Sequence, residues 1–280
     1  MILGFLGKGG SGKSSVSTQM TYFLTQVKNK KVLAIDSDHN MDLSFNLSNG
    51  ESVKMNSLGE SFKDLEKYTG ESQYKETFLK NKDVIFTLSP KDEFTEKYTK
   101  KISENLNLMQ AGPQTENVLY GKSCSHILTT PLKTYLPLLK LKKDEFVVVD
   151  EKAGADGVTT GIVTGLDVGV IVFEPTTHSI KTAKQISELM NFYKTPFVFV
   201  ANKTQSEDDI DFVKQNFENE NIFYLPSTRK VKQNPFDFDT KWEGELEKVL
   251  EKAKEKNQNN RKERTLEKFK KSDRFEKNSF

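Results

Sequence analysis

Short apolar runs that end in a glycine or a polar residue recur along this chain and alternate with segments of helical spacing. The runs cover residues 2–6, 31–36, 105–112, 145–150, 168–175, 196–203 and 221–226, and the clearest helical segments cover 14–27, 179–193 and 208–217. This alternation predicts an α/β fold with a mostly parallel β-sheet covered by helices on both faces. Such sheets bind ligands at the carboxyl ends of their strands, so the residues that follow each run are candidates for a site.

Other segments are less regular. Residues 48–105 are polar and weakly patterned; within them, 54–68 is predicted to be a helix and 83–89 a strand. Residues 126–141 are leucine-rich and predicted to be helical, although Pro131 and Pro137 would kink or break a helix there.

The composition changes near the carboxyl end, and we divide the chain into a domain over 1–235 and a charged tail over 236–280. One helical stripe in the tail carries Trp242, Leu246, Val249, Leu250 and Ala253. After Ala253 the mixture of Lys, Glu, Asn and Arg predicts a solvated helix or partial disorder. A tail that binds a partner or a surface is the alternative.

Composition restricts the possible functions. The 280 residues carry 42 Lys and Arg against 40 Asp and Glu, and this near balance argues against a protein that mainly coats nucleic acid. Cys124 is the only cysteine, so no internal disulfide can form, which is typical of a reducing cytosol. No stretch approaches the ~18–20 apolar residues that span a bilayer, and the start lacks signal-peptide features. We therefore expect a soluble, cytoplasmic protein with no strong tendency to bind membranes or nucleic acid.

The first apolar run leads into Gly7-Lys8-Gly9-Gly10-Ser11-Gly12-Lys13-Ser14, which matches the phosphate-loop pattern G-x-x-x-x-G-K-[ST]. Glycines let successive N–H groups point at phosphate oxygens, and the helix that follows presents its positive end to the anion. Lys13 is predicted to reach the β and γ phosphates, and Ser14 to bind Mg²⁺. The predicted ATP-binding residues of the loop are Gly9, Gly10, Ser11, Gly12, Lys13, Ser14 and Ser15. A glycine-rich turn without a ligand is the alternative.

The loop resembles the deviant Walker A loop of the MinD/ParA/nitrogenase-iron-protein group of P-loop ATPases, because a second lysine, Lys8, follows the first glycine. The resemblance covers about residues 1–235 and implies a P-loop ATPase domain. It also implies an ATP-dependent homodimer in which Lys8 reaches the partner's nucleotide and stabilises charge on the transferred phosphoryl group. A solvated lysine on the rim of the loop is the alternative.

Acidic residues follow the second strand in the stretch Ala-Ile-Asp-Ser-Asp-His-Asn-Met-Asp, residues 34–42. In the resembling group the second acid of D-x-D orients the attacking water, and this position is Asp38 here. The predicted catalytic residues are therefore Lys8, Lys13 and Asp38. Asp36 is predicted to hold the metal shell or the loop, and Asp42 is interpreted as a helix cap.

Two further strand ends carry candidate ligands. Asp150 follows four apolar residues and is predicted to bind Mg²⁺ through water, so the predicted Mg²⁺ site comprises Ser14, Asp36 and Asp150. The resemblance implies that Asn202 contacts adenine and that Pro226 lines the base. A strand-end asparagine that only forms a turn is the alternative.

Within this group the chain looks most like the nickel-insertion ATPases that mature carbon monoxide dehydrogenase, the CooC type, over residues 108–126 and 167–186. Where that branch has a metal-binding C-x-C, this chain has Cys124-Ser125-His126, and the acid of its D-x-E-A-G switch is moved by one place. Cys124 and His126 from two subunits would form a Cys₂His₂ set that suits Zn²⁺ or Ni²⁺ at a dimer interface. A lone cysteine that behaves as a small hydrophobe is the alternative.

Three functions agree with these features. The favoured one is a Mg²⁺-dependent, ATP-hydrolysing dimeric switch, a CooC-like accessory ATPase that serves an unidentified client metalloenzyme. The alternative is a MinD/ParA-like positioning or partition ATPase that acts through a surface or a partner. A nucleotide-gated scaffold that does not hydrolyse ATP is the third. The polar face of residues 242–253 alternates Glu and Lys, which argues mildly against binding to anionic membranes.

Overall fold

The computed structural model describes residues 1–80, 83–114, 116–121, 125–217 and 221–277. Its centre is an eight-stranded sheet in the order β10-β9-β8-β1-β7-β2-β5-β4, in which only the β4–β5 pair is antiparallel. The strands are β1 (Ile2–Gly7), β2 (Lys31–Asp36), β4 (Lys100–Lys101), β5 (Leu106–Gln110), β7 (Glu145–Asp150), β8 (Val168–Phe173), β9 (Phe197–Thr204) and β10 (Ile222–Pro226). Two short strands, β3 (Phe86–Thr87) and β6 (Leu139–Lys140), form a separate parallel pair. Because β1 lies between β7 and β8, the loop that follows it is surrounded by strand ends.

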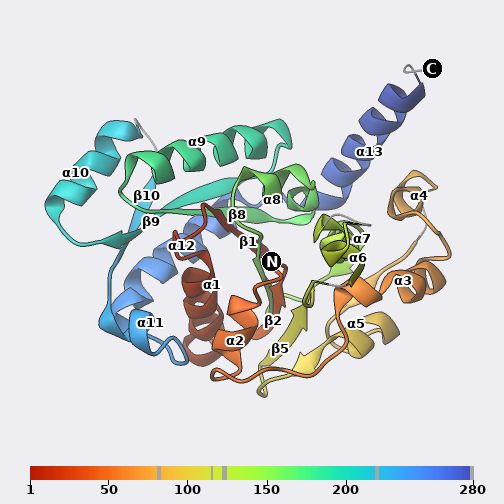
Figure 1. Ribbon diagram of the computed structural model, residues 1–280, viewed down its shortest axis with the longest axis horizontal. Helices are drawn as coiled ribbons and strands as arrows, with labels where there is room; N and C mark the ends of the chain where they lie inside the picture. Colours follow the sequence, from red (N-terminus) through yellow and green to blue (C-terminus); the bar gives the residue numbers. More distant parts are fainter. Residues whose placement is uncertain (81–82, 115, 122–124, 218–220, 278–280) are drawn as a thin grey trace.

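Helices cover both faces of the sheet, as predicted (Figure 1). One face carries α1 (Lys13–Tyr22), α2 (Asp42–Leu47) and α12 (Glu243–Lys256). The other carries α3 (Phe62–Thr69), α4 (Tyr74–Leu79), α5 (Glu93–Tyr98), α7 (Leu132–Leu138), α8 (Ala155–Thr159), α9 (Thr177–Phe192), α10 (Glu207–Asn216) and α13 (Arg261–Lys277). Strand β1 contributes side chains to the hydrophobic cores on both faces of the sheet, because successive side chains of a strand point to opposite faces. Leu3 and Phe5 pack in the core beneath α1, α2 and α12, and Ile2 and Leu6 pack in the core on the other face. The α/β fold with a mostly parallel sheet is thereby confirmed.

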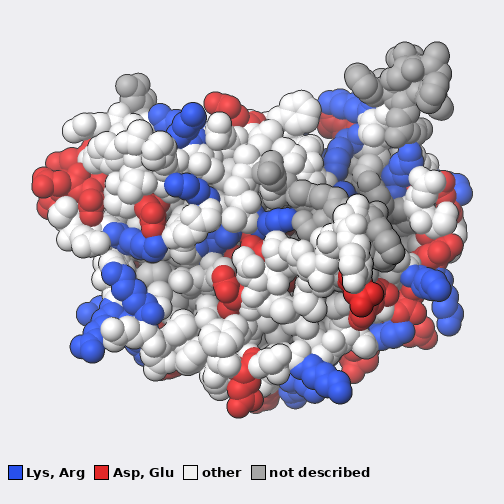
Figure 2. Space-filling model, in the orientation of Figure 1, with Lys and Arg blue, Asp and Glu red and all other residues white. Residues whose placement is uncertain are grey.

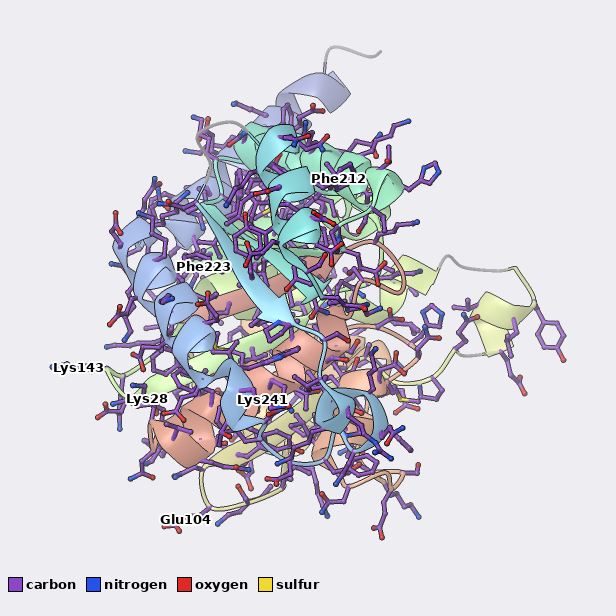
Figure 3. The ribbon with its side chains drawn as sticks, turned by 90° about the vertical axis from the view of Figure 1, so that its left-hand side faces the viewer. Lys28, Glu104, Lys143, Phe212, Phe223 and Lys241 are labelled. Atoms are coloured by element: carbon purple, nitrogen blue, oxygen red, sulfur yellow. The ribbon has the colours of Figure 1, made fainter. Side chains whose placement is uncertain are left out.

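The outer edge of the sheet at β10 shows the same two layers (Figure 3). Phe212 on α10 packs with one core, and Phe223 on β10 packs with the other. Two further short helices are α6 (Glu116–Leu119) and α11 (Arg229–Gln233). A π-helical turn covers Phe23–Val27, and 3₁₀ helices cover Leu58–Glu60, Ser125–Thr129, Ile162–Gly165 and Thr240–Trp242. None of the helices in the described ranges has both the length and the apolar composition needed to cross a membrane.

The polar segment 48–105 is less regular than predicted. The helix predicted over 54–68 begins only at Phe62, after a 3₁₀ turn at Leu58–Glu60, and the strand predicted over 83–89 is reduced to Phe86–Thr87. Packing explains the second difference, because Phe86 is fully buried between the rings of Tyr135 and Tyr68, at centroid distances of 4.9 and 5.0 Å. The position of Phe86 is therefore determined mainly by contacts between aromatic rings and less by hydrogen bonding between strands.

The prolines divide the leucine-rich segment 126–141 into three short elements. A 3₁₀ helix covers Ser125–Thr129, Pro131 caps α7, and Pro137 lies in the last turn of that helix. Strand β6 begins at Leu139, directly after it. The prediction of a single helix over this range is therefore wrong, because the prolines interrupt it.

The tail lies against the sheet. Trp242 is buried and its indole N–H donates to the carbonyl oxygen of Pro226 at 3.0 Å. The apolar stripe of α12 is buried in the same core. After Ala253 the predicted charged helix is present as α13, but the expectation that it is solvated is wrong in part, because Arg264, Thr265 and Phe269 are buried. Residues 242–269 thus contribute to the same two cores as the preceding chain, and the boundary at residue 235 remains a prediction from composition.

Candidate nucleotide site

The phosphate loop connects β1 to α1 between the ends of β7 and β8. Two of its glycines are required by the space around them. A Cβ on Gly7 would lie 2.1 Å from the carbonyl oxygen of Val172. At Gly12, where φ is +89°, a Cβ would lie 2.2 Å from Nδ2 of Asn202. No described side chain caps the amino end of α1, so its first N–H groups are open to an anion.

The two lysines of the loop lie in different surroundings. Lys13 is the first residue of α1 and is buried, whereas Lys8 is exposed on the rim with Gly9 and Gly10. The N–H of Ser11 donates to the carbonyl oxygen of Lys8 at 3.1 Å, which closes the turn that carries Lys8. The buried Lys13 is placed to bind the chain's own nucleotide, and the exposed Lys8 is free to reach that of a partner. Both roles remain predictions.

Asp150 ends β7 beside the phosphate loop with an unsatisfied carboxylate. It is fully buried, and neither carboxylate oxygen has a well-formed hydrogen bond to a described residue, although the Ser14 hydroxyl lies near enough to interact with it. Burial raises the pKa of Asp150 to about 6, while the Lys13 ammonium and the Ser14 hydroxyl favour its charged form. A buried carboxylate that lacks well-formed hydrogen bonds is costly unless a cation compensates its charge. The donor set therefore fits a Mg²⁺ ion held by Asp150 and Ser14 together with phosphate oxygens and water.

Asp36 holds the loop that follows β2. It lies opposite Asp150 in the β2–β7 register, and its carboxylate accepts the backbone N–H of Ser44 at 2.7 Å and that of Asp38 at 3.3 Å. Burial and the Asp150 carboxylate raise the pKa of Asp36 to about 8. Asp36 therefore positions the backbone around Asp38, and its place in the Mg²⁺ shell remains a prediction.

Asp38, the predicted water-orienting residue, is buried within this loop. Its Oδ1 accepts the N–H of Asn40 at 3.2 Å and lies 3.5 Å from Nδ1 of His39. Asp42 is the first residue of α2 and makes no capping bond there, because the left-handed Met41 is the cap.

A second carboxylate at the end of β7 was not predicted as a site residue. Glu151 is buried, and its Oε2 accepts the hydroxyl of Ser37 at 3.2 Å. The same hydroxyl donates to the carbonyl oxygen of Asp150 at 2.7 Å, so Ser37 ties the Asp38 loop to β7. Burial raises the pKa of Glu151 to about 8. The sequence signal was present, since this acid is the one displaced from the D-x-E-A-G pattern.

Strand β9 supplies two side chains to the phosphate loop. Asn202, predicted to contact adenine, donates from Nδ2 to the carbonyl oxygen of Ser11 at 2.9 Å. Lys203, which sequence reasoning missed, donates from Nζ to the carbonyl oxygen of Gly10 at 2.7 Å. Pro226 is exposed at the end of the neighbouring strand β10. The adenine contacts of Asn202 and Pro226 remain predictions.

The predicted transition-metal pair cannot be placed. Cys124 lies outside the described residues, and of Ser125 and His126 the structure gives only the 3₁₀ backbone. In the described part of the chain, no group of three or more His, Cys, Asp or Glu side chains is arranged to hold a metal ion.

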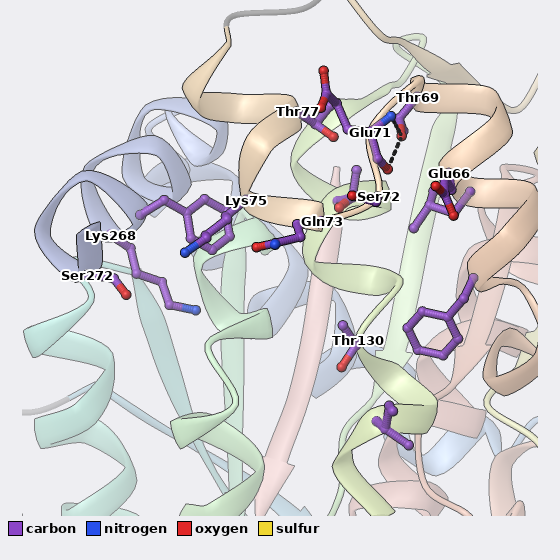
Figure 4. Close-up of a pocket in the computed structure, with 15 residues that line it drawn as sticks. Glu66, Thr69, Glu71, Ser72, Gln73, Lys75, Thr77, Thr130, Lys268 and Ser272 are labelled. Atoms are coloured by element: carbon purple, nitrogen blue, oxygen red, sulfur yellow. Dashed lines mark hydrogen bonds between the residues drawn. The ribbon is translucent and has the colours of Figure 1, made fainter. Parts of the chain in front are cut away.

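A cavity of about 550 Å³ lies between α3, α4 and α13 (Figure 4). Lys268 of α13 reaches into it. Leu65 and Phe269 also line it and supply part of its apolar wall. No residue of the phosphate loop lines this cavity, so it is separate from the nucleotide site.

Charges of both signs are mixed over the face drawn in Figure 2. Acidic side chains gather over α10, whose first turn contains Glu207, Asp208 and Asp209. Lysines and arginines are interspersed with acids over most of the rest of the coloured surface. A face of this kind lacks the one-signed field that steers polyanions.

A glycine loop between a central parallel strand and a helix, with a buried lysine and an unsatisfied aspartate beside it, defines a P-loop nucleotide-binding protein. The comparison with known families is more specific. The model of the CobQ/CobB/MinD/ParA nucleotide binding domain matches residues 5–237, and the chain belongs to this family.

Individual relatives agree with that membership. An uncharacterized ATP-binding protein of Methanocaldococcus jannaschii is 30% identical over 261 residues, which cover 89% of this chain and 96% of the relative. The carbon monoxide dehydrogenase accessory protein CooC of Rhodospirillum rubrum is 26% identical over 215 residues, or 76% of this chain and 78% of CooC. The structure of a Cyanothece McdA–ATP complex shares the fold, with a TM-score of 0.63, 17% identity and coverage of 91% of this chain and 95% of that one.

Proposed function

We propose that this protein binds Mg²⁺·ATP in the phosphate loop and hydrolyses it as a face-to-face homodimer. The observation that carries the proposal is the buried Asp150 carboxylate, which lies beside Lys13 and Ser14 and makes no well-formed hydrogen bond to any residue that the structure describes. A charged oxygen in this position needs a cation, and a phosphate loop next to it supplies the remaining anionic ligands.

The proposed roles follow from where each side chain lies. The loop N–H groups and Lys13 bind the phosphates, and Ser14 and Asp150 hold the ion. Mg²⁺, when bound, neutralises charge on the phosphate oxygens. Asp38 orients the attacking water, in a loop that Asp36 and Ser37 fix to the sheet.

Lys8 is proposed to act on the partner's nucleotide, because it is exposed on the rim while Lys13 occupies the buried position. Lys8→Ala is expected to lower the rate of ATP hydrolysis at least ~100-fold, since a cation delivered to the transition state has effects of this size or larger. ADP affinity is expected to change less than about threefold, because the chain's own site retains Lys13. Lys63→Ala, at another exposed lysine, serves as the control.

The assays are phosphate release and sedimentation velocity with ADP or a non-hydrolysable ATP analogue. We expect a dimer only with the triphosphate analogue. A wild type that stays monomeric with the analogue, together with full turnover in Lys8→Ala, would remove the dimer from the proposal. ATP-dependent dimers without phosphate release would instead support a nucleotide-gated scaffold.

The output is proposed to be metalloenzyme maturation, with a nickel or zinc ion as cargo. Two observations support it: the CooC protein among the relatives, and the Cys124-Ser125-His126 stretch. Titration of the analogue-bound protein with Ni²⁺ and Zn²⁺ is expected to show one Cys124-dependent ion per dimer, which is lost in Cys124→Ser. Dimers that bind no Cys124-dependent metal would favour the alternative, a MinD/ParA-like ATPase that acts through a surface or a partner protein.

A further inference from the structure

Lys203 is an extra residue in the pairing of two parallel strands. The β9–β10 register pairs Asn202 with Leu225 and Thr204 with Pro226, so Lys203 has no partner residue on β10. Its φ of +62° lies in the left-handed region, which is unfavourable for a lysine. An extra residue of this kind is a β-bulge, and bulges next to active sites redirect side chains.

The bulge lets two consecutive side chains reach one loop. In a regular strand, neighbouring residues point to opposite faces of the sheet. Here Asn202 donates to the carbonyl oxygen of Ser11 at 2.9 Å, and Lys203 donates to that of Gly10 at 2.7 Å. Successive carbonyl groups of the phosphate loop are thus both held from β9.

Glu174, just beyond β8, fixes the direction of the lysine. Its Oε1 forms an ion pair with Nζ of Lys203, and its backbone N–H donates to the hydroxyl of Ser179 in α9. The Lys203 side chain is 40% exposed and that of Glu174 is 28% exposed, so the pair lies at the surface of the loop. A surface ion pair contributes little to stability. Stability alone therefore does not explain why a lysine with a strained, left-handed backbone occupies this position.

The contacts have a consequence for anion binding. A phosphate loop binds through its N–H groups, which requires its carbonyl groups to point away from the phosphates. Each bond from β9 holds one carbonyl in that direction. A hydrogen bond to a peptide oxygen also polarises the N–H of the same peptide. For the Ser11 carbonyl this is the N–H of Gly12, and for the Gly10 carbonyl it is the N–H of Ser11, which closes the turn to the Lys8 carbonyl oxygen at 3.1 Å.

We infer that Lys203 is a positioning residue for the phosphate loop, held by Glu174, and that it sets the affinity for nucleotide before the nucleotide arrives. The inference rests on the proposed nucleotide binding. A preorganised loop increases the affinity for the phosphates that ADP and ATP have in common. Loss of the lysine is therefore expected to weaken both nucleotides equally and to leave kcat at saturation nearly unchanged.

The test is Lys203→Gly with Lys194→Gly as its matched control. Glycine accepts a positive φ, so the variant removes the amine while it relieves the backbone strain. Lys194 has a φ of +55° and also pairs with a glutamate, Glu267, at 3.1 Å, but it lies at the end of α9. The two variants therefore change the same chemistry, and only one of them changes the loop.

Calorimetric titration with Mg²⁺·ADP and with a non-hydrolysable ATP analogue is expected to give Kd values about tenfold higher for Lys203→Gly than for wild type. Lys194→Gly is expected to stay within about twofold of wild type, and the melting temperatures of the two variants should agree within a few degrees. Glu174→Gln should raise the Kd less, about threefold, because the amine keeps its bond to Gly10. Lys203→Arg, which keeps a donor, should recover part of the affinity.

The outcomes are distinguishable. A wild type that binds neither nucleotide removes the proposed function itself. A wild type that binds, with equal Kd values in Lys203→Gly and Lys194→Gly, overturns the positioning role alone. Tighter binding in Lys203→Gly would also overturn it, since the lysine would then oppose the nucleotide. A fall in kcat without a change in Kd would assign Lys203 to the reaction step and equally contradict the inference.

Discussion

Replacement of Lys268 by methionine is expected to stabilise the protein near neutral pH. Lys268 lies on α13, where burial, and then the charge of Lys133, lower the pKa of its ammonium from an ordinary 10.5 to about 8. Its Nζ lies 5.3 Å from the ring centroid of Phe269 and 5.9 Å from that of Tyr193. Methionine keeps the apolar stem and removes the charge that the folded state disfavours.

The magnitude follows from the pKa. Because the folded pKa lies below that of the unfolded chain, the destabilisation is fully present below pH 8 and is lost as pH rises toward 10.5. One pH unit of difference corresponds to about 1.4 kcal/mol, so Lys268 lowers the free energy of unfolding by up to roughly 3 kcal/mol at pH 7. Loss of the two ring contacts offsets about 1–2 kcal/mol of the gain in Lys268→Met. We therefore expect a net gain of roughly 1–2 kcal/mol at pH 7.

The assay is urea unfolding at pH 7 and pH 9.5, followed by the fluorescence of Trp242, the only tryptophan. The wild type regains stability as Lys268 loses its proton in the folded state, so the advantage of Lys268→Met should shrink by about 2 kcal/mol between the two pH values. Lys270→Met, at an exposed position of the same helix, should show no such change. An advantage of equal size at both pH values, or a variant that is less stable than wild type at both, would refute the reasoning.

Three further changes test the site and the tail. Gly12→Ala is expected to weaken ADP binding at least tenfold in calorimetry and to lower the free energy of unfolding by roughly 1–3 kcal/mol. The reason is that φ is +89° at this position and the new Cβ would lie 2.2 Å from Nδ2 of Asn202. A variant as stable as wild type would contradict this geometry. Trp242→Phe removes a partly buried hydrogen bond to Pro226 and should cost about 1–3 kcal/mol by circular dichroism in urea, and a neutral effect would show that the tail is not anchored there. Asp150→Asn should raise the stability of the nucleotide-free protein in EDTA at pH 7 by roughly 1–2 kcal/mol and abolish the effect of Mg²⁺ on ATP binding. The folded pKa of Asp150 is raised to about 6, so wild-type stability should fall as pH rises through the range 4 to 6 and the variant should lack that fall; equal pH profiles would argue against the buried charge.

Part of the site was accessible to sequence reasoning because its chemistry is local. Residues 7–14 are contiguous, Asp36 and Asp150 each end an apolar run, and Asp38 lies two residues after Asp36. Glu151 and Lys203 were missed, although each is adjacent to a predicted residue. Their roles depend on contacts with Ser37 and Gly10, which are distant in sequence, and no periodicity reports such contacts.

The amino-acid sequence by itself determined the alternation of strands and helices, the position of the phosphate loop and the acids around it. These features follow from short-range rules, since the spacing of apolar side chains and the freedom of glycine act over a few residues. Only the tertiary structure decided that α13 is half-buried, that Phe86 is fixed by ring packing, and that a bulge on β9 holds the phosphate loop. The physical reason is that burial and hydrogen bonding between distant segments can outweigh local preference. The highly charged α13 buries Phe269 because its ring packs on that of Phe78 in α4, at a centroid distance of 5.3 Å.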